Sequence, residues 1–318
     1  MKKSLAAMLM ATTLLAAPAC AKQPAGDAPH NEVSAPATLP AGEVAEGKRF
    51  TVLVTGNAKG PDVVLIPGLS TPRDVWGATA EKLKDKYRLH IVQIRGFGDA
   101  AGVNGEGPVL DPFVRELADY IDDEIINHRR AAPALIGHSM GGLAALLIAE
   151  QIPGKIGKVM VVDAVPFIGT LGSPDATVET VRPQADAMRK MMLAAPKAPP
   201  QPNDRAAQTA ASMVKNEAEQ SRAADWIRAA DMRVTAQLFH DIMTTDARAD
   251  LGKISAPVTL LYAQDDSVMP AAAAEAAFVP QYKGVARFTP VMVPDSRHFI
   301  MLDQPERFHA EVAKFLKG

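Results

Sequence analysis

Residues 134–146 have the sequence ALIGHSMGGLAAL, in which a short apolar run leads into GHSMG (137–141) and a second apolar stretch follows. This order predicts a strand, a sharp turn and a helix, with a serine at the turn. The flanking glycines suit the turn because a Cβ there would clash. The helix directs its first N–H groups toward anionic charge that develops beside the serine. The stretch therefore predicts a nucleophile elbow that presents Ser139.

Strand-like and helical patterns alternate on both sides of this motif. Runs typical of strands occur at residues 50–54, 63–66, 89–94, 134–136, 159–162, 258–262 and 288–293. Helical patterns lie between them, as in 113–130, where apolar residues recur every four positions. Such alternation requires right-handed crossovers. The chain is therefore predicted to be an α/β protein with a mostly parallel, doubly wound sheet.

The alternation stops in residues 169–249, which contain helix-forming stretches and a Pro-rich loop but no strand pattern. A segment of this length is too long for a simple loop. We interpret it as a helical cap inserted after the strand-like run at 159–162. The cap divides the predicted core into residues 48–168 and 250–318.

A serine nucleophile needs a general base, and the chain has seven histidines. His298 follows the last predicted strand, at the edge of a parallel sheet where such sites are assembled. His138 lies inside the turn itself, where a packing or hydrogen-bonding role is the ordinary expectation. The other five lie in the N-terminal segment, in a strand or on helical stretches. We therefore predict that His298 is the base.

The carboxylate that orients the base should follow another strand. Asp266 comes after the run 258–262 and lies four residues before Pro270, and it is the predicted acid. Asp265 is a close alternative. Asp163, directly after the run at 159–162, is a second alternative. With Asp266 the chain order is serine, aspartate, histidine, as this type of site requires.

Two backbone N–H groups are needed to stabilise an oxyanion. One is predicted at Met140, directly after the serine, and the other at Leu69 in the sequence PGLS (67–70). Gly68 permits a close approach of Leu69 to the site. Taken alone, Pro-Gly is also the signature of a plain turn.

Together these motifs resemble the α/β-hydrolase fold family, in particular its cap-bearing branch of esterases, lipases and cofactor-free haloperoxidase-like enzymes. The resemblance extends from about residue 49 to the C-terminus. It rests on VLIPGL (64–69), Trp76, RGFG (95–98), GHSMGG (137–142), Asp266 with Pro270, and His298 with Pro305 and Phe308.

The resemblance implies an acyl-transfer mechanism without a cofactor. Ser139 attacks an acyl carbon, His298 takes its proton, Asp266 orients the imidazole, and Leu69 and Met140 bind the oxyanion. Water then releases the acyl group. The implied activity is hydrolysis of a carboxylic ester or related small acyl compound.

Two positions depart from the family pattern. Pro67 stands where the family usually has histidine, and Arg297 stands where it usually has glycine before the catalytic histidine. Neither removes a reacting atom. A cation at Arg297 is expected to lie near the mouth of the site and to favour acidic or polar substrates.

Other activities share the same residues. An acyltransferase, a carbon–carbon bond hydrolase or a perhydrolase would use the same serine, acid and histidine. From another class, a non-catalytic ligand-binding module could keep the fold, although the complete set of reactive residues argues against it.

Composition excludes several further classes. The chain is 47% hydrophobic and 22% charged, with a formal net charge of −2, which offers no basic surface for nucleic acid. The glycines at 96, 98 and 102 do not form a dinucleotide-binding motif, and no P-loop occurs. No histidine, cysteine or carboxylate spacing predicts a metal site. A small-molecule substrate is the expected partner.

The N-terminus predicts export. Two lysines precede an apolar stretch at 5–17, which has the length of a signal-peptide core and is too short to span a bilayer. Cleavage after Ala19 or Ala21 fits the small-x-small pattern, so we assign residues 1–21 to a signal peptide. The mature protein is expected to be periplasmic or secreted.

The single cysteine, Cys20, resembles a lipobox cysteine, although Ala17 occupies the position where leucine is usual. Cys20 is therefore either the site of a lipid anchor or discarded with the signal peptide. A lipid anchor at Cys20 is the one membrane attachment that the sequence leads us to expect. Residues 22–47 are rich in alanine, proline and polar residues, which predicts a flexible tether.

Overall fold

The computed structural model describes residues 38–129, 131–195 and 201–317. The predicted signal peptide, Cys20 and most of the predicted tether lie outside the described residues. Within the described ranges, no helix combines the length and the hydropathy needed to cross a bilayer.

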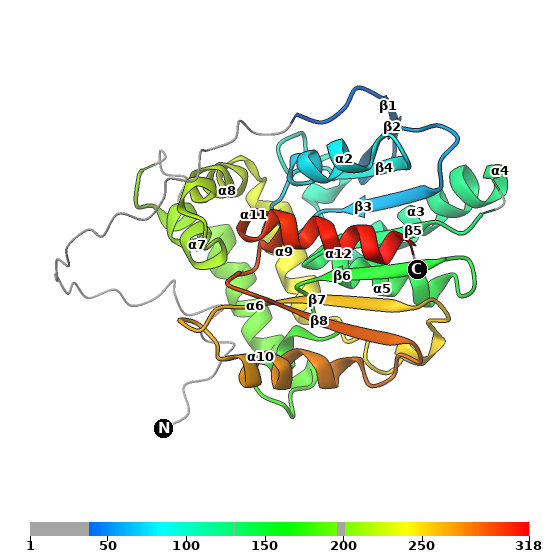
Figure 1. Ribbon diagram of the computed structural model, residues 1–318. Helices are drawn as coiled ribbons and strands as arrows, with labels where there is room; N and C mark the ends of the chain where they lie inside the picture. The colour runs from blue at the N-terminus through cyan, green and yellow to red at the C-terminus, as the bar shows by residue number, and fades with distance from the viewer. Residues whose placement is uncertain (1–37, 130, 196–200, 318) are drawn as a thin grey trace, which may run out of the picture.

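An eight-stranded sheet forms the centre of the molecule, in the order β1-β2-β4-β3-β5-β6-β7-β8 (Figure 1). The strands are β1 (Glu43–Glu46), β2 (Phe50–Gly56), β3 (Asp62–Ile66), β4 (Arg88–Ile94), β5 (Ala134–His138), β6 (Lys158–Val162), β7 (Val258–Gln264) and β8 (Phe288–Pro294). The pairs β1–β2 and β2–β4 are antiparallel, and all pairs from β4 to β8 are parallel. The predicted mostly parallel sheet is confirmed.

Strand β1 corrects the expected extent of the tether. The tether is predicted to reach residue 47, whereas Glu43–Glu46 pairs with β2 at the sheet edge. Three of its four residues are exposed and the fourth is only half-buried. An edge strand without a buried face carries no apolar alternation, which is why its sequence does not predict a strand.

Helices cover both faces of the sheet. The alternation of side chains in β3 shows this directly: Val63 and Leu65 pack in one apolar cluster, and Val64 and Ile66 pack in the other. The first cluster includes side chains of α2 (Gly77–Leu83), α11 (Ile300–Asp303) and α12 (Pro305–Lys317), which lie in front of the sheet in Figure 1. The second includes α3 (Leu110–Tyr120), α5 (Met140–Gln151) and α10 (Ala271–Phe278). A π-helical turn (Ile121–Ile126) joins α3 to the short α4 (Asn127–Arg129).

In the described residues of the predicted insertion, between β6 and β7, the α-helices are α6 (Val178–Ala194), α7 (Arg205–Met213), α8 (Glu217–Ala229) and α9 (Met232–Met243). Each begins at a polar residue whose side-chain oxygen accepts a backbone N–H of the first turn. In Figure 1, α7 and α8 lie at one end of the sheet, next to α11. We refer to α6–α9 as the cap.

Candidate active site

The turn between β5 and α5 holds Ser139 in a strained conformation. Its backbone has φ 54° and ψ −123°, and its N–H donates to the Val162 carbonyl at 2.9 Å. A Cβ at Gly137 would lie 2.0 Å from the Gly141 oxygen, and one at Gly141 would lie 2.3 Å from the Ile66 oxygen. Only glycine fits these two positions. The geometry is that of the predicted nucleophile elbow, with the serine at the N-terminus of α5.

His298 lies between β8 and α11 and is paired with Asp163, the first residue after β6. The distance from His298 Nδ1 to Asp163 Oδ2 is 2.7 Å. The other carboxylate oxygen, Oδ1, accepts the Ala263 N–H at 2.8 Å. The side chains are 16% and 9% exposed. Because a carboxylate only accepts, Nδ1 carries the proton and Nε2 keeps the lone pair that a general base uses.

Asp266 does not take this place, contrary to the expectation from sequence. Its side chain is exposed, and Oδ1 accepts from Gln264 Nε2 at 2.7 Å. The alternative Asp265 is buried, but its carboxylate faces Arg297 Nε at 3.0 Å and Lys215 Nζ at 3.3 Å. Both carboxylates of the β7 loop are thus engaged by partners other than His298. The acid beside His298 comes from β6 instead.

Two sequence signals point to this outcome. Asp163 directly follows the buried run of β6, in the strand next to β5. Arg297, immediately before His298, supplies the partner that occupies Asp265. Burial raises the pKa of Asp265, but hydrogen bonds from Ser267 and Arg297 outweigh it and lower the pKa to about 2.

Arg297 itself is not a free cation at the mouth of the site. Besides Asp265, its guanidinium donates through Nη1 to the carbonyl of Ala211 in α7 at 2.6 Å. The charge is therefore neutralised in a contact between the cap and the His298 loop. The expected preference for acidic substrates loses its structural basis.

His138 is hydrogen-bonded to the loop that carries His298. Its ring is fully buried, and Nε2 lies 3.0 Å from the His298 carbonyl oxygen, to which it must donate. The ring centroids of the two histidines are 4.7 Å apart. Burial, together with the charge of His298, holds the pKa of His138 well below its usual range. His138, neutral and directly before Ser139 in the chain, is thus hydrogen-bonded to the backbone of His298, the predicted base.

The loop after β3 approaches Ser139 closely, as the Leu69 prediction requires. A Cβ at Gly68 would lie 3.1 Å from Ser139 Cβ and 2.9 Å from His138 Nδ1. Met140 is the first residue of α5. The structure therefore brings Gly68, the residue before the predicted donor Leu69, close to Ser139, and the other predicted donor, Met140, directly follows Ser139.

Metal coordination finds no support in the described part of the chain. Among residues 38–129, 131–195 and 201–317, no three histidine, cysteine or carboxylate side chains form a group able to hold a metal ion. The site consists of a serine, a histidine, a carboxylate and backbone N–H groups.

Comparison with known proteins places this site in context. The model of the alpha/beta hydrolase family matches residues 63–311. A pimeloyl-[acyl-carrier protein] methyl ester esterase of Nitrosomonas europaea is 26% identical over 271 residues, which cover 80% of this chain and 94% of the esterase.

Solved structures share the fold. A hydrolase of Pseudomonas aeruginosa superposes with a TM-score of 0.69 at 19% identity, over 88% of this chain and 100% of that one. A thermophilic esterase of Thermogutta terrifontis gives a TM-score of 0.66 at 21% identity, over 86% and 98% of the two chains.

Proposed function

Because this chain belongs to the alpha/beta hydrolase family, we propose that it is a serine hydrolase that cleaves a carboxylic ester through an acyl-enzyme on Ser139. The observation that carries the proposal is the 2.7 Å contact between His298 Nδ1 and Asp163 Oδ2, assembled beside the elbow that holds Ser139. A histidine fixed in this tautomer is equipped to remove the serine proton.

The reaction proceeds in two acyl transfers. Ser139 Oγ attacks the ester carbonyl carbon while His298 Nε2 takes its proton, and Asp163 stabilises the imidazolium. The N–H groups of Leu69 and Met140 hold the oxyanion. Collapse of the tetrahedral intermediate breaks the bond to the alkoxide, which leaves as alcohol with the proton from His298. Water, deprotonated by His298, then releases the acid and restores Ser139.

The choice of ester as substrate is supported by the relative of Nitrosomonas europaea, which is named as a methyl ester esterase and matches most of this chain. The acyltransferase alternative differs only in the acceptor of the second step. An alcohol added to the assay would then yield a new ester in preference to the free acid.

The test is labelling and turnover on the purified protein. A fluorophosphonate should form one adduct, located by mass spectrometry on Ser139. A panel of p-nitrophenyl esters graded by acyl length should be hydrolysed, and Ser139→Ala should lower turnover by about 10⁴-fold or more. The matched control is Ser255→Ala: Ser255 is an exposed residue before β7, and its hydroxyl accepts the Gly154 N–H at 2.9 Å. Labelling at another residue would reject the mechanism.

We also propose that the protein is exported. The proposal rests on the two N-terminal lysines, the apolar stretch at 5–17 and the small residues that follow it. Expression in a bacterial host should give a mature chain that begins at Lys22 or Cys20. Palmitate incorporated at Cys20 would establish a lipid anchor, a start at Lys22 would exclude it, and retention of Met1 would reject export.

A further inference from the structure

Two buried hydroxyls connect the cap to the loop that carries Leu69. Ser70 Oγ lies 2.9 Å from Thr235 Oγ1, and the two residues are 6% and 8% exposed. Ser70 belongs to the loop after β3, whereas Thr235 lies in the first half of α9. The hydrogen bond therefore joins two segments that are 165 positions apart in the chain.

Ser70 has a backbone conformation that serine seldom adopts. The Thr71 N–H donates to the Gly68 carbonyl at 3.3 Å, which closes a four-residue turn. Ser70 occupies the third position of this turn with φ 54°. Glycine or asparagine is favoured there, and another residue costs about 1–3 kcal/mol. Such a conformation persists where surrounding contacts hold it.

The turn sets the direction of the predicted oxyanion donor. The Gly68 carbonyl and the Leu69 N–H belong to one planar trans peptide, so they point in opposite directions. Fixing the carbonyl through the Thr71 N–H therefore fixes the Leu69 N–H. Thr71 Oγ1 also donates to the Leu69 carbonyl at 3.0 Å, which restrains the next peptide of the turn, between Leu69 and Ser70.

Thr235 is presented by a helix that is attached to the core at both ends. At its start, the Asp231 N–H donates to the Gly96 carbonyl at 2.7 Å. Near its end, Asp241 Oδ2 accepts the N–H groups of Val109 and Leu110 at 2.7 and 3.0 Å. The position of the Thr235 hydroxyl is therefore determined by the core and not by the cap alone.

We propose that Thr235 is a positioning residue of the reaction: through Ser70 it holds the strained turn that aims the Leu69 N–H at the oxyanion. This inference rests on the proposed function, since it assigns the cap a part in stabilising the transition state. Thr235 touches no reacting atom. Its effect should appear in kcat and not in KM, because the oxyanion forms only after the substrate has bound.

The decisive variant is Thr235→Val, which keeps the shape of the side chain and removes the hydroxyl. Loss of an oxyanion donor lowers kcat by about 10²- to 10³-fold, so a displaced donor should lower it roughly 10- to 100-fold, with KM within about twofold. Thr235→Ser keeps the hydroxyl and should restore most of kcat.

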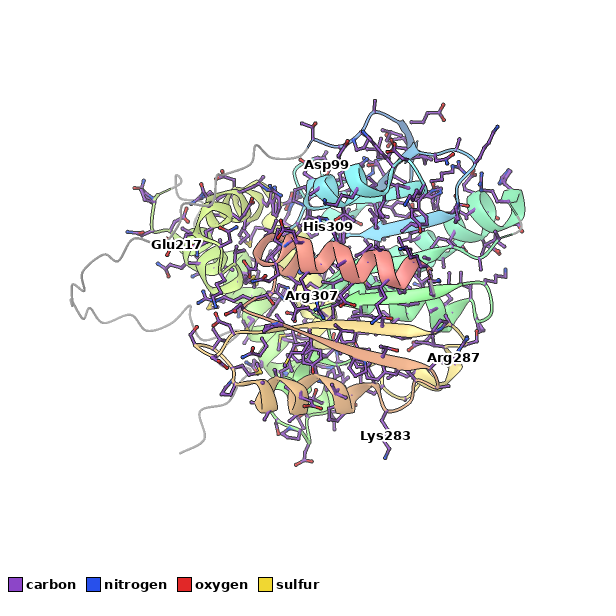
Figure 2. All side chains as sticks on the ribbon, viewed as in Figure 1. Asp99, Glu217, Lys283, Arg287, Arg307 and His309 are labelled. Atoms are coloured by element: carbon purple, nitrogen blue, oxygen red, sulfur yellow. The ribbon has the colours of Figure 1, made fainter. Side chains whose placement is uncertain are left out.

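The matched control is Thr79→Val in α2. Thr79 is 1% exposed, and its hydroxyl lies 3.3 Å from Nε2 of His309 on α12, the residue labelled in Figure 2. Both valine variants remove one buried hydroxyl, so both should lower Tm. Only Thr235→Val should lower kcat and the rate at which a fluorophosphonate modifies Ser139.

Three results would overturn the inference: equal kcat in Thr235→Val and the wild type, equal losses in both valine variants, or no recovery with Thr235→Ser. If Thr235→Val does not fold, Ser70→Ala serves instead, because alanine keeps the strain of the positive φ and lacks the hydroxyl. Wild-type kcat in Ser70→Ala would also overturn it. A wild-type protein whose Ser139 does not react would reject the proposed function itself.

Discussion

Replacing Asp163 with asparagine preserves the shape of the side chain, removes its negative charge and replaces one accepting oxygen by a donating NH₂ group. The Ala263 N–H, 2.8 Å from Oδ1, will keep the amide oxygen of the variant on its own side. The amide NH₂ then faces His298 Nδ1 in place of Oδ2, at the present 2.7 Å distance. A donor at that position requires an unprotonated Nδ1, so the proton moves to Nε2 and the lone pair faces away from Ser139.

The expected loss has an electrostatic part and a tautomeric part. Charges about 4 Å apart in a partly buried pair interact by about 4 kcal/mol at an effective dielectric constant near 20. That energy stabilises the imidazolium in the transition state and corresponds to roughly 10³-fold in rate. With the wrong tautomer included, Asp163→Asn should lower kcat by roughly 10³- to 10⁴-fold.

Steady-state hydrolysis of a p-nitrophenyl ester measures this loss, with Asp266→Asn as the matched control. Asp266 is exposed, and its carboxylate accepts a hydrogen bond from Gln264. Asp266→Asn should therefore retain kcat within about twofold. The reverse pattern, a large loss in Asp266→Asn and a small one in Asp163→Asn, would refute the assignment of the acid to β6.

Two further variants test electrostatics away from the reacting atoms. Arg297→Ala should lower the free energy of unfolding by about 1–3 kcal/mol at pH 7, because the buried Asp265 loses a charged partner. Since the pKa of Asp265 is lowered to about 2, its contribution is complete above about pH 4 and disappears as the pH falls through 2. Urea curves of variant and wild type should therefore converge in acid, and an undiminished difference at pH 2 would contradict this account. Glu150→Gln should have the opposite effect, because burial raises the pKa of Glu150 from 4.5 to about 7. Between pH 4.5 and 7, Glu150 is still protonated in the folded wild type but ionised in the unfolded chain, so the free energy of unfolding falls as the pH rises through this range. Above pH 7 the glutamine variant should be more stable than the wild type by about 1–2 kcal/mol, allowing for partial solvent screening. A difference in urea midpoint between variant and wild type that is the same at pH 5 and at pH 8 would contradict this account.

The elbow at Ser139 was predictable because its requirements are local. A strand, two crowded glycines and a helix follow one another within a few residues, and the chain must make this turn whatever surrounds it. The position of His298 followed almost as directly, since a loop after a parallel strand lies at the same sheet edge as the elbow. The helical cap was predictable from the loss of the strand pattern.

The acid was not predictable in the same way. Asp163, Asp265 and Asp266 all follow parallel strands, so the local pattern allows each of them to reach the site. Their roles were decided by partners distant in sequence: Arg297 and Lys215 engage Asp265, whereas Ala263 and His298 engage Asp163. Strand β1 escaped prediction because an exposed edge carries no apolar period.

By itself the sequence determined the α/β architecture, the serine turn and the loop of the predicted base, because each depends on the order and spacing of neighbouring residues. Only the tertiary structure decided which carboxylate faces His298, that Arg297 is neutralised, and that Thr235 of the cap meets Ser70. Those outcomes depend on which side chains meet across long stretches of chain, and periodicity along one segment carries no information about such contacts.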